Sequence, residues 1–414
     1  MIYSDIRTRI PDGQKRKGHM HYESLFSSKV SAEVEMPVGL KADTKYVFSV
    51  TYADPNALSP QKLVETIGAG LLNEAFDLAP YPPPQGHTRM RELICRNLKE
   101  NRGLDVDVES VFLTSGAGGA IQSFIDVLVD PGDLVLVEEF CYLGTIKMLL
   151  QRRANVIHVP SDEQGMRTDA LESVIGELRS KNKQPKLIYT IPIYQNPMGM
   201  TLSLERRKQV VEISQRFQVP ILENDSYADF RIDGPTLPPT MMGLDDNQAV
   251  MYVSAYTKLI GCGLRLGYGI APAPVLDRLA RFDRGSSPSH LAAIGVHEYL
   301  NKYLDDHLDS VRNSLKIKRD TMLEALAENF PNSCTWNRPT GGMMLWVRLP
   351  EGSDTWAALD KAVEADVKYN PGPVFKADRS GANYLRLTYS HNSADEIREG
   401  IAILAEVFHQ EGYF

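Results

Sequence analysis

The sequence predicts an α/β fold in which helices cover both faces of a mostly parallel sheet, followed by a smaller α+β domain. Between residues 111 and 270, short apolar segments rich in β-branched residues alternate with helical stretches, which is typical of such a sheet. Beyond Ala271 this alternation stops. A chain of 414 residues has room for two or three domains.

The composition is that of a globular protein and argues against two kinds of partner. The chain is 43% hydrophobic and 24% charged, and its formal net charge is −8. Its one basic cluster, formed by Lys15, Arg16 and Lys17, is short and is interpreted as a solvated arm. Since no long basic block is present, we expect neither a nucleic-acid partner nor binding to an anionic membrane surface.

Three sequence features bear on the cellular compartment. No apolar run reaches the roughly 18 residues that a membrane span needs, and residues 1–17 contain no hydrophobic signal core. The four cysteines are widely spaced and form no Cys-x-x-Cys pair. We therefore expect a cytoplasmic protein with reduced thiols and no membrane partner, disulfide or metal site.

The elements follow from hydrophobic periodicity and from residues that break it. Residues 61–77 are predicted to form an amphipathic helix, which the Pro-rich segment 81–86 ends, and another helix starts near Arg89. The strands expected in the sheet are 111–114, 134–137, 156–159, 187–190, 219–222, 250–253 and 266–270. Residues 288–330 are predicted to form two long helices, and Ser393 and Glu396 to form a capping box that opens the last helix.

Polar or glycine-rich segments follow several of these strands. Ligands of open α/β sheets bind beyond the carboxyl ends of the strands, so these segments should converge. The segment of Ser115, Gly116 and Ala117 enters a helix whose free backbone amides are suited to phosphate. The segments after four other strands contain Tyr142, Asn196, the group of Asn224, Asp225 and Tyr227, and Lys258.

Lys258 lies in a glycine-rich turn between two strands that should be buried. Desolvation lowers the pKa of a lysine amine and frees it to attack a carbonyl group. Arg265 follows seven residues later, past Gly261 and Gly263, where its guanidinium could neutralise a phosphate. Taken alone, Lys258 is better interpreted as a solvated turn lysine, and the evidence for a catalytic lysine has to come from the other segments.

Arg386 interrupts an apolar strand near the end of the chain. A buried charge costs several kcal/mol unless it is paired. The arginine therefore requires either a structural ion pair or a carboxylate ligand.

Together these segments resemble the fold-type I pyridoxal 5′-phosphate (PLP) enzymes of the class I and II aminotransferase family. The resemblance covers about residues 46 to 405, including Lys258 with Arg265 and the segment Gln195-Asn196-Pro197-x-Gly199. Within that family the sequence resembles aminoadipate and kynurenine aminotransferases, and we expect it to lack the DNA-binding domain of regulator fusions. It implies the three-layer PLP-transferase fold: an N-terminal arm with part of the small domain (1–60), a large PLP-binding domain (61–285), and a bridging helix with a small C-terminal domain (286–414).

The resemblance also implies a role for each segment. Lys258 would hold PLP as a Schiff base and act as the catalytic acid and base, while Arg386 would bind the substrate α-carboxylate. Thr51 stands where the family has a glycine against that carboxylate, and Asn196 also borders the substrate. The cofactor would be held by Ser115, Gly116, Ala117, Tyr142, Asn196, Tyr227 and Arg265. Tyr81 would reach the phosphate of a partner subunit, which implies a homodimer.

One departure from the family pattern concerns the chemistry. The family acid that pairs with the pyridine nitrogen is replaced by Asn224. Either the backbone shifts so that Asp225 takes this role, or the cofactor is a weaker electron sink. The first hypothesis is an aminotransferase acting between an α-amino acid and a 2-oxo acid. The alternatives are a specialised biosynthetic lyase, synthase, decarboxylase or oxidase, and a non-catalytic PLP-binding sensor.

Overall fold

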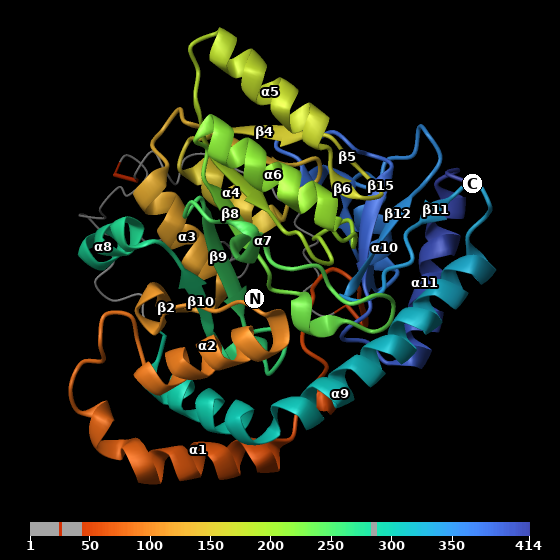
Figure 1. Cartoon of the computed structure of the whole chain (residues 1–414). Coiled ribbons are helices and arrows are strands. Elements are labelled where there is room, and N and C mark those ends of the chain that lie inside the picture. The colour runs from red at the N-terminus through yellow and green to blue at the C-terminus, as the bar shows by residue number, and fades with distance from the viewer. Residues whose placement is uncertain (1–24, 27–43, 283–287) are drawn as a thin grey trace, which may run out of the picture.

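The computed structural model describes residues 25–26, 44–282 and 288–414, and Figure 1 shows the arrangement of their helices and strands. The basic cluster at Lys15, Arg16 and Lys17 and most of the expected N-terminal arm lie outside these ranges, as does residue 285, where the expected large domain ends. In the part of the chain that is described, no helix is long and apolar enough to cross a bilayer.

The central sheet contains seven strands in the order β2-β10-β9-β8-β7-β3-β4. Only β10 is antiparallel to its neighbours, so the predicted mostly parallel sheet is confirmed. The strands are β2 (Val111–Thr114), β3 (Leu134–Glu138), β4 (Asn155–Val159), β7 (Pro185–Thr190), β8 (Ile221–Asn224), β9 (Val250–Ala255) and β10 (Gly267–Ile270). β8 begins two residues later than expected, directly after Pro220, which has no amide hydrogen for a strand ladder.

Helices cover both faces of this sheet because neighbouring strand residues point to opposite sides. On β3, Leu136 packs in one apolar cluster with residues of α5 (Thr168–Ser180) and α6 (Leu204–Phe217). Val135 belongs to the cluster that includes residues of α3 (Gly116–Leu128) and α4 (Leu143–Gln151). The remaining elements of this region are α2 (Thr88–Arg102), α7 (Met241–Leu244), α8 (Ala273–Phe282) and the hairpin of β5 (Ser161–Asp162) and β6 (Gly165–Met166).

A second sheet lies toward the C-terminal end of the chain and has the order β11-β12-β15-β14. Its strands are β11 (Thr335–Trp336), β12 (Met344–Arg348), β14 (Asn370–Pro371) and β15 (Tyr384–Thr388), accompanied by α10 (Leu359–Glu364) and α11 (Ala394–Gln410). The predicted capping box of Ser393 and Glu396 opens α11. β1 (Tyr46–Val47) pairs in parallel with β13 (Val367–Lys368), so residues from both ends of the described chain meet here.

One long helix, α9 (His290–Asn329), connects the two regions and contacts α1 (Pro60–Glu74), α2 and α11 (Figure 1). The prediction of two helices over residues 288–330 is wrong. Residues 290–329 contain no proline and a single glycine, Gly295, so nothing in the sequence interrupts the helical hydrogen bonds.

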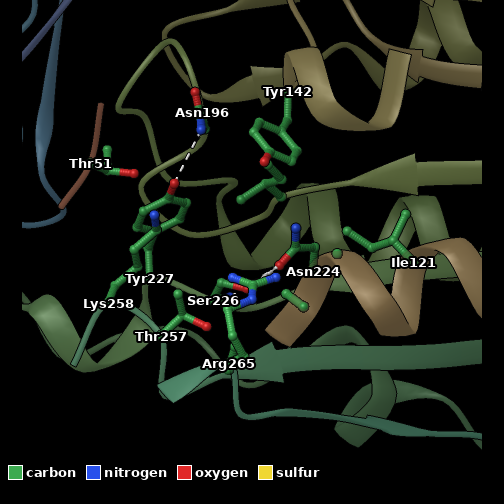
Figure 2. Close-up of a pocket in the computed structure, with 14 residues that line it drawn as sticks. Thr51, Ile121, Tyr142, Asn196, Asn224, Ser226, Tyr227, Thr257, Lys258 and Arg265 are labelled. Atoms are coloured by element: carbon green, nitrogen blue, oxygen red, sulfur yellow. Dashed lines mark hydrogen bonds between the residues drawn. The ribbon is translucent and has the colours of Figure 1, made fainter. Parts of the chain in front are cut away.

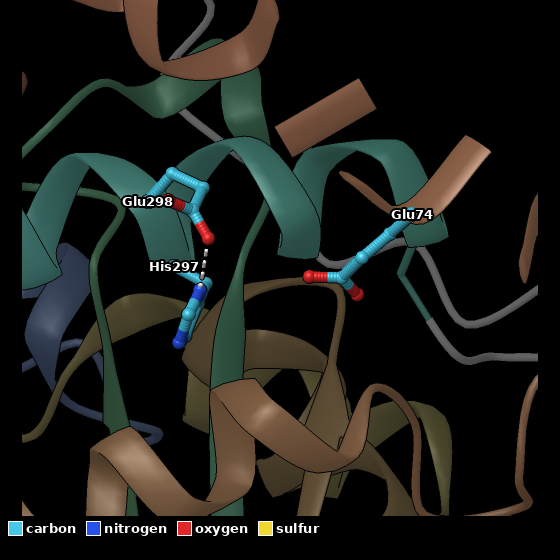
Figure 3. Close-up of side chains that lie close together, drawn as sticks. All are labelled: Glu74, His297 and Glu298. Atoms are coloured by element: carbon cyan, nitrogen blue, oxygen red, sulfur yellow. Dashed lines mark hydrogen bonds and ion pairs between the residues drawn. The ribbon is translucent and has the colours of Figure 1, made fainter. Parts of the chain in front are cut away.

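A charged cluster ties α1, α2 and α9 together, and Figure 3 shows three of its members, Glu74, His297 and Glu298. Glu74 accepts a 2.6 Å hydrogen bond from His87 Nε2 and pairs with Arg89. Arg89 also lies 3.4 Å from Glu298, which lies 3.1 Å from His297 Nδ1. The ligand atoms of Glu74, His297 and Glu298 all lie within 4.8 Å of one another. Because Arg89 already contacts both carboxylates, we interpret this cluster as a structural link between helices.

Candidate active site

A cavity of about 140 Å³ opens beyond the carboxyl ends of the parallel strands, where the polar segments were expected to converge (Figure 2). Its wall includes the predicted site residues Thr51, Ala117, Tyr142, Asn196, Asn224, Tyr227, Lys258 and Arg265. These residues come from segments more than 200 positions apart in the sequence. The fold therefore brings together most of the side chains that the sequence singled out.

Lys258 lies in the turn after β9, before a single turn of 3-10 helix (Cys262–Leu264). Its Nζ is 3.9 Å from Cys262 Sγ. Burial lowers the pKa of this amine below its ordinary value, and the positive charges of Arg386 and Arg265 lower it further. The unprotonated amine, which is the form that attacks a carbonyl or accepts a proton, is therefore favoured relative to a solvated lysine.

The end of the cavity next to α3 is built to hold an anion. Arg265 Nη2 donates a 3.0 Å hydrogen bond to the Ser115 carbonyl, which keeps the guanidinium beside the start of α3. Gly116 has φ of +77°, and a Cβ atom there would lie 3.1 Å from Thr257 Oγ1 and 3.3 Å from Arg265 Nη2. Glycine thus allows the backbone to approach both groups closely.

Two groups at this end lack a partner within the described structure. Thr257 Oγ1 is buried and has no hydrogen-bond partner. Ser115, at the N-cap of α3, makes no side-chain cap hydrogen bond, so the first amides of that helix remain available. A hydroxyl, a guanidinium and free helix amides are together suited to the oxygen atoms of a phosphate.

Arg386 lies on β15 behind the cavity wall, and its side chain is fully buried there. Its Nη1 donates a 2.8 Å hydrogen bond to Asn196 Oδ1, and its Nη2 donates to the Ser49 carbonyl. Within the described chain it forms no ion pair, and its Nε has no partner. Burial lowers the pKa of this guanidinium to about 10. Of the two explanations that the sequence left open, the structural ion pair is absent among the described residues, which favours a carboxylate ligand.

Asn196 connects Arg386 to a tyrosine. Its Nδ2 donates a 3.1 Å hydrogen bond to the Tyr227 hydroxyl, which therefore keeps its own hydrogen for another acceptor. Burial raises the pKa of Tyr227, so this hydroxyl stays protonated at neutral pH. The pair of amide and hydroxyl groups can hold a phenolic oxygen of a ligand.

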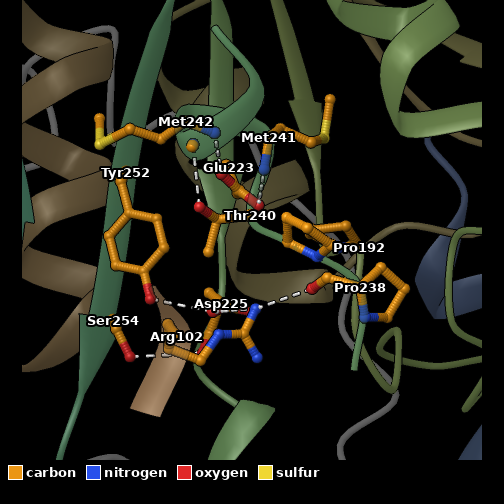
Figure 4. Close-up of polar contacts among 12 residues, drawn as sticks. Arg102, Pro192, Glu223, Asp225, Pro238, Thr240, Met241, Met242, Tyr252 and Ser254 are labelled. Carbon is orange, nitrogen blue, oxygen red and sulfur yellow. Dashed lines mark hydrogen bonds and ion pairs between the residues drawn. The ribbon is translucent and has the colours of Figure 1, made fainter. Parts of the chain in front are cut away.

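The structure distinguishes the two neighbouring residues at the end of β8. Asn224 lines the cavity, whereas Asp225 does not. The Asp225 carboxylate accepts a 2.9 Å hydrogen bond from the Tyr252 hydroxyl and lies 3.3 Å from Arg102 Nη2 (Figure 4). Consecutive residues at a strand end point to opposite sides, so the backbone shift that would bring Asp225 into the cavity does not occur.

The other predicted residues lie around the cavity or away from it. Ser115 and Gly116 form the backbone behind Arg265 and Thr257, and are not part of the wall themselves. Tyr81 is fully exposed and lies outside the cavity of its own chain. Two further residues of the cavity wall, Thr257 and Ser226, were not singled out from the sequence; the signal for Thr257 was its hydroxyl directly before the candidate lysine.

Comparison with known proteins identifies the family. Residues 52–404 match the family described as aminotransferase class I and II. Aromatic-amino-acid aminotransferase 1 of Thermococcus litoralis is 31% identical over 402 residues, which is 95% of this chain and 96% of that protein.

Two solved structures extend the likeness to the fold. The multiple substrate aminotransferase of Thermococcus profundus has a TM-score of 0.88 and is 29% identical, covering 95% of this chain and 99% of that one. The α-aminoadipate aminotransferase LysN of Thermus thermophilus, complexed with N-(5′-phosphopyridoxyl)-L-leucine, has a TM-score of 0.86 and is 26% identical. The match covers 94% of this chain and 99% of that one. These matches confirm the predicted PLP-transferase fold and imply PLP as the cofactor. The chain belongs to the class I and II aminotransferases and is an enzyme that transfers amino groups.

Proposed function

We propose that PLP binds in this cavity with its phosphate against Arg265, Thr257 and the first turn of α3, and with Lys258 as the amine that carries it. Asn196 and Tyr227 would hold its phenolic oxygen, and Tyr142 would pack against its ring. The unpartnered hydroxyl of Thr257 supports this placement, because it is buried beside a guanidinium and free helix amides. When bound, PLP withdraws electrons from the α-carbon of the substrate.

The residues of the chain then bind the substrate and move its proton. Arg386 binds the α-carboxylate through its guanidinium, and its hydrogen bond to Asn196 fixes that group relative to the cofactor site. Lys258, with its lowered pKa, would act as the base that takes the proton from the α-carbon and as the acid that gives it back. Thr51 borders the substrate side of the cavity.

The reaction is amino transfer between an α-amino acid and a 2-oxo acid. The observation that carries this proposal is a buried, unpaired guanidinium linked by one amide to the cavity that contains the lysine. The named relatives are aminotransferases, which disfavours both the lyase, decarboxylase or oxidase alternatives and the non-catalytic sensor.

We propose aromatic amino acids and 2-aminoadipate as the first substrates to test, since the names of two similar proteins include them. The purified protein would be mixed with each amino acid and with 2-oxoglutarate or pyruvate. Formation of the new amino acid, together with conversion of the cofactor to pyridoxamine phosphate, supports the proposal. A cofactor spectrum that changes without any amino transfer would support the lyase or oxidase alternative instead.

We further propose that two copies of the chain associate, with Tyr81 of one subunit completing the site of the other. Leu72, Phe76 and Tyr81 support this proposal, because they are 89%, 92% and 100% exposed around the C-terminal end of α1. Large apolar side chains that are exposed within one short segment of the chain are candidates for burial against a partner. The cytoplasmic location stays a prediction.

A further inference from the structure

The orientation of the Asn224 side chain is fixed by its neighbours. The backbone N–H of Ser226 can only donate, so the atom 3.2 Å from it must be the amide oxygen Oδ1. The Ser226 hydroxyl also lies 2.6 Å from Oδ1. Both acceptor sites of that oxygen are therefore used, and the amide nitrogen is the group that remains for a ligand.

The Asn224 nitrogen has one hydrogen to spare. Nδ2 carries two hydrogens, and one of them is donated to the Tyr189 hydroxyl at 2.9 Å. Figure 2 shows the nitrogen directed toward the side of the cavity where Tyr142 lies, with the oxygen toward Ser226. Toward the cavity Asn224 is thus a donor, and an amide nitrogen cannot act as an acceptor.

The covalent structure of PLP, placed as proposed above, brings its ring nitrogen to this residue. In PLP the aldehyde carbon stands between the phosphate arm and the phenolic oxygen, and the ring nitrogen is on the opposite side of the ring. Lys258 marks the aldehyde position, Arg265 the phosphate and Asn196 the phenolic oxygen. The nitrogen therefore points away from Lys258, toward the side of the cavity where Asn224 lies (Figure 2).

The charges around the cavity do not favour a protonated ring. No carboxylate is among the described residues of the cavity wall, and its charged members are Lys258 and Arg265. The adjacent carboxylate, Asp225, lies on the other side of the strand, paired with Arg102 and Tyr252 (Figure 4). A pyridinium would thus face an N–H donor without a compensating anion, whereas an unprotonated nitrogen would accept a hydrogen bond.

We propose that Asn224 donates a hydrogen bond to the pyridine nitrogen of PLP and keeps that nitrogen unprotonated. This inference rests on the cofactor placement proposed above. A neutral ring withdraws electrons less strongly than a pyridinium, so the α-proton of the substrate is less acidic. Proton transfer by Lys258 then limits turnover, which the reaction of an α-deuterated substrate reveals as a primary isotope effect.

The test uses PLP labelled with ¹⁵N in the ring and loaded into the full chain. In the wild-type protein at pH 7, the nitrogen resonance is expected at the position of unprotonated pyridine. In Asn224→Asp it should move to the position of pyridinium, and the isotope effect on α-deuterated substrate should shrink. Ser226→Ala is the matched control: it leaves the backbone N–H that orients Asn224, so the resonance should stay at the wild-type position.

The outcomes separate this inference from the proposed function. A pyridinium resonance in the wild-type protein overturns the role of Asn224 while leaving aminotransferase activity intact. An unprotonated resonance in a protein that transfers no amino group contradicts the proposed reaction and supports the role of Asn224. Failure of the labelled cofactor to bind overturns both the role of Asn224 and the proposed function. The wild-type spectrum decides the question even where Asn224→Asp does not fold.

Discussion

Arg386 on β15 and Asn196 after β7 are joined by a 2.8 Å hydrogen bond between Nη1 and Oδ1, although they are 190 positions apart in the sequence. This contact links the smaller sheet to the cavity beyond the larger one. A buried cation held in this way, with no anionic partner among the described residues, is positioned for the carboxylate of a substrate.

Arg386→Ala is expected to raise KM for the amino acid by about 10- to 100-fold, because hydrogen bonds to charged groups contribute roughly 1.5–3 kcal/mol. Arg386→Lys keeps the charge but loses the bidentate geometry, so it should recover only part of the loss. Steady-state kinetics check this, and PLP affinity should be unchanged. An unaltered KM in both variants would place the carboxylate elsewhere.

Thr257→Ala is expected to weaken PLP binding by about tenfold, since a hydrogen bond to a charged phosphate is lost. Equilibrium dialysis or fluorescence titration measures the dissociation constant. Thr257→Ser retains a hydroxyl and should restore most of the affinity. If the Thr257→Ala and Thr257→Ser variants bind PLP equally well, the buried Thr257 hydroxyl does not contact the phosphate.

The pH dependence of the reaction should show the lowered pKa of Lys258. Its amine is released from the cofactor once the substrate is bound and accepts a proton only when it is neutral, so kcat should rise with pH and level off above the pKa of the amine. Because burial and two arginines lower that pKa, the inflection is expected below the ordinary value of 10.5. Arg265→Met removes one positive charge and should move the inflection to higher pH. An inflection that stays at the value of a solvated lysine would contradict the assignment.

Phe76→Glu should convert a dimer to a monomer, because it places a charge on the exposed apolar surface near Leu72 and Tyr81. Analytical ultracentrifugation measures the mass. Tyr81→Phe should leave the dimer intact and weaken PLP binding, since only the hydroxyl is lost. A wild-type protein that sediments as a monomer would exclude the proposed role of Tyr81.

The sequence was sufficient for the sheet and for most of the cavity. Alternating apolar segments defined the seven strands, and polar segments at their carboxyl ends could be expected to meet in space. The segments that contain Lys258, Asn196 and Tyr227 are predicted in this way, and the resemblance to the family singles out these residues within them. The structure places all three in one cavity wall.

The features of the site that the sequence does not predict depend on the direction in which single side chains point. A shift of one residue at the end of β8 decides whether Asn224 or Asp225 faces the cavity, and sequence alone does not fix it. The unpartnered state of Thr257 emerges only from packing around Gly116. The length of α9 is not evident from the sequence, because the apolar stripe over residues 288–330 is too weak to show that one helix continues through it.

Replacement of Lys258 should abolish the reaction. Lys258→Ala is expected to lower kcat by about three orders of magnitude or more, because the catalytic acid and base is removed. Lys147→Ala, which changes an exposed lysine on α4, is the matched control and should retain wild-type activity. Melting temperatures of both variants close to wild type would show that the loss is not caused by unfolding.

The most direct test of the account is to saturate the protein with PLP, reduce it with borohydride and map the peptides by mass spectrometry. The peptide containing Lys258 is expected to carry the mass of the reduced cofactor, and no other lysine is expected to be modified. An unmodified Lys258 peptide from PLP-saturated protein would contradict it.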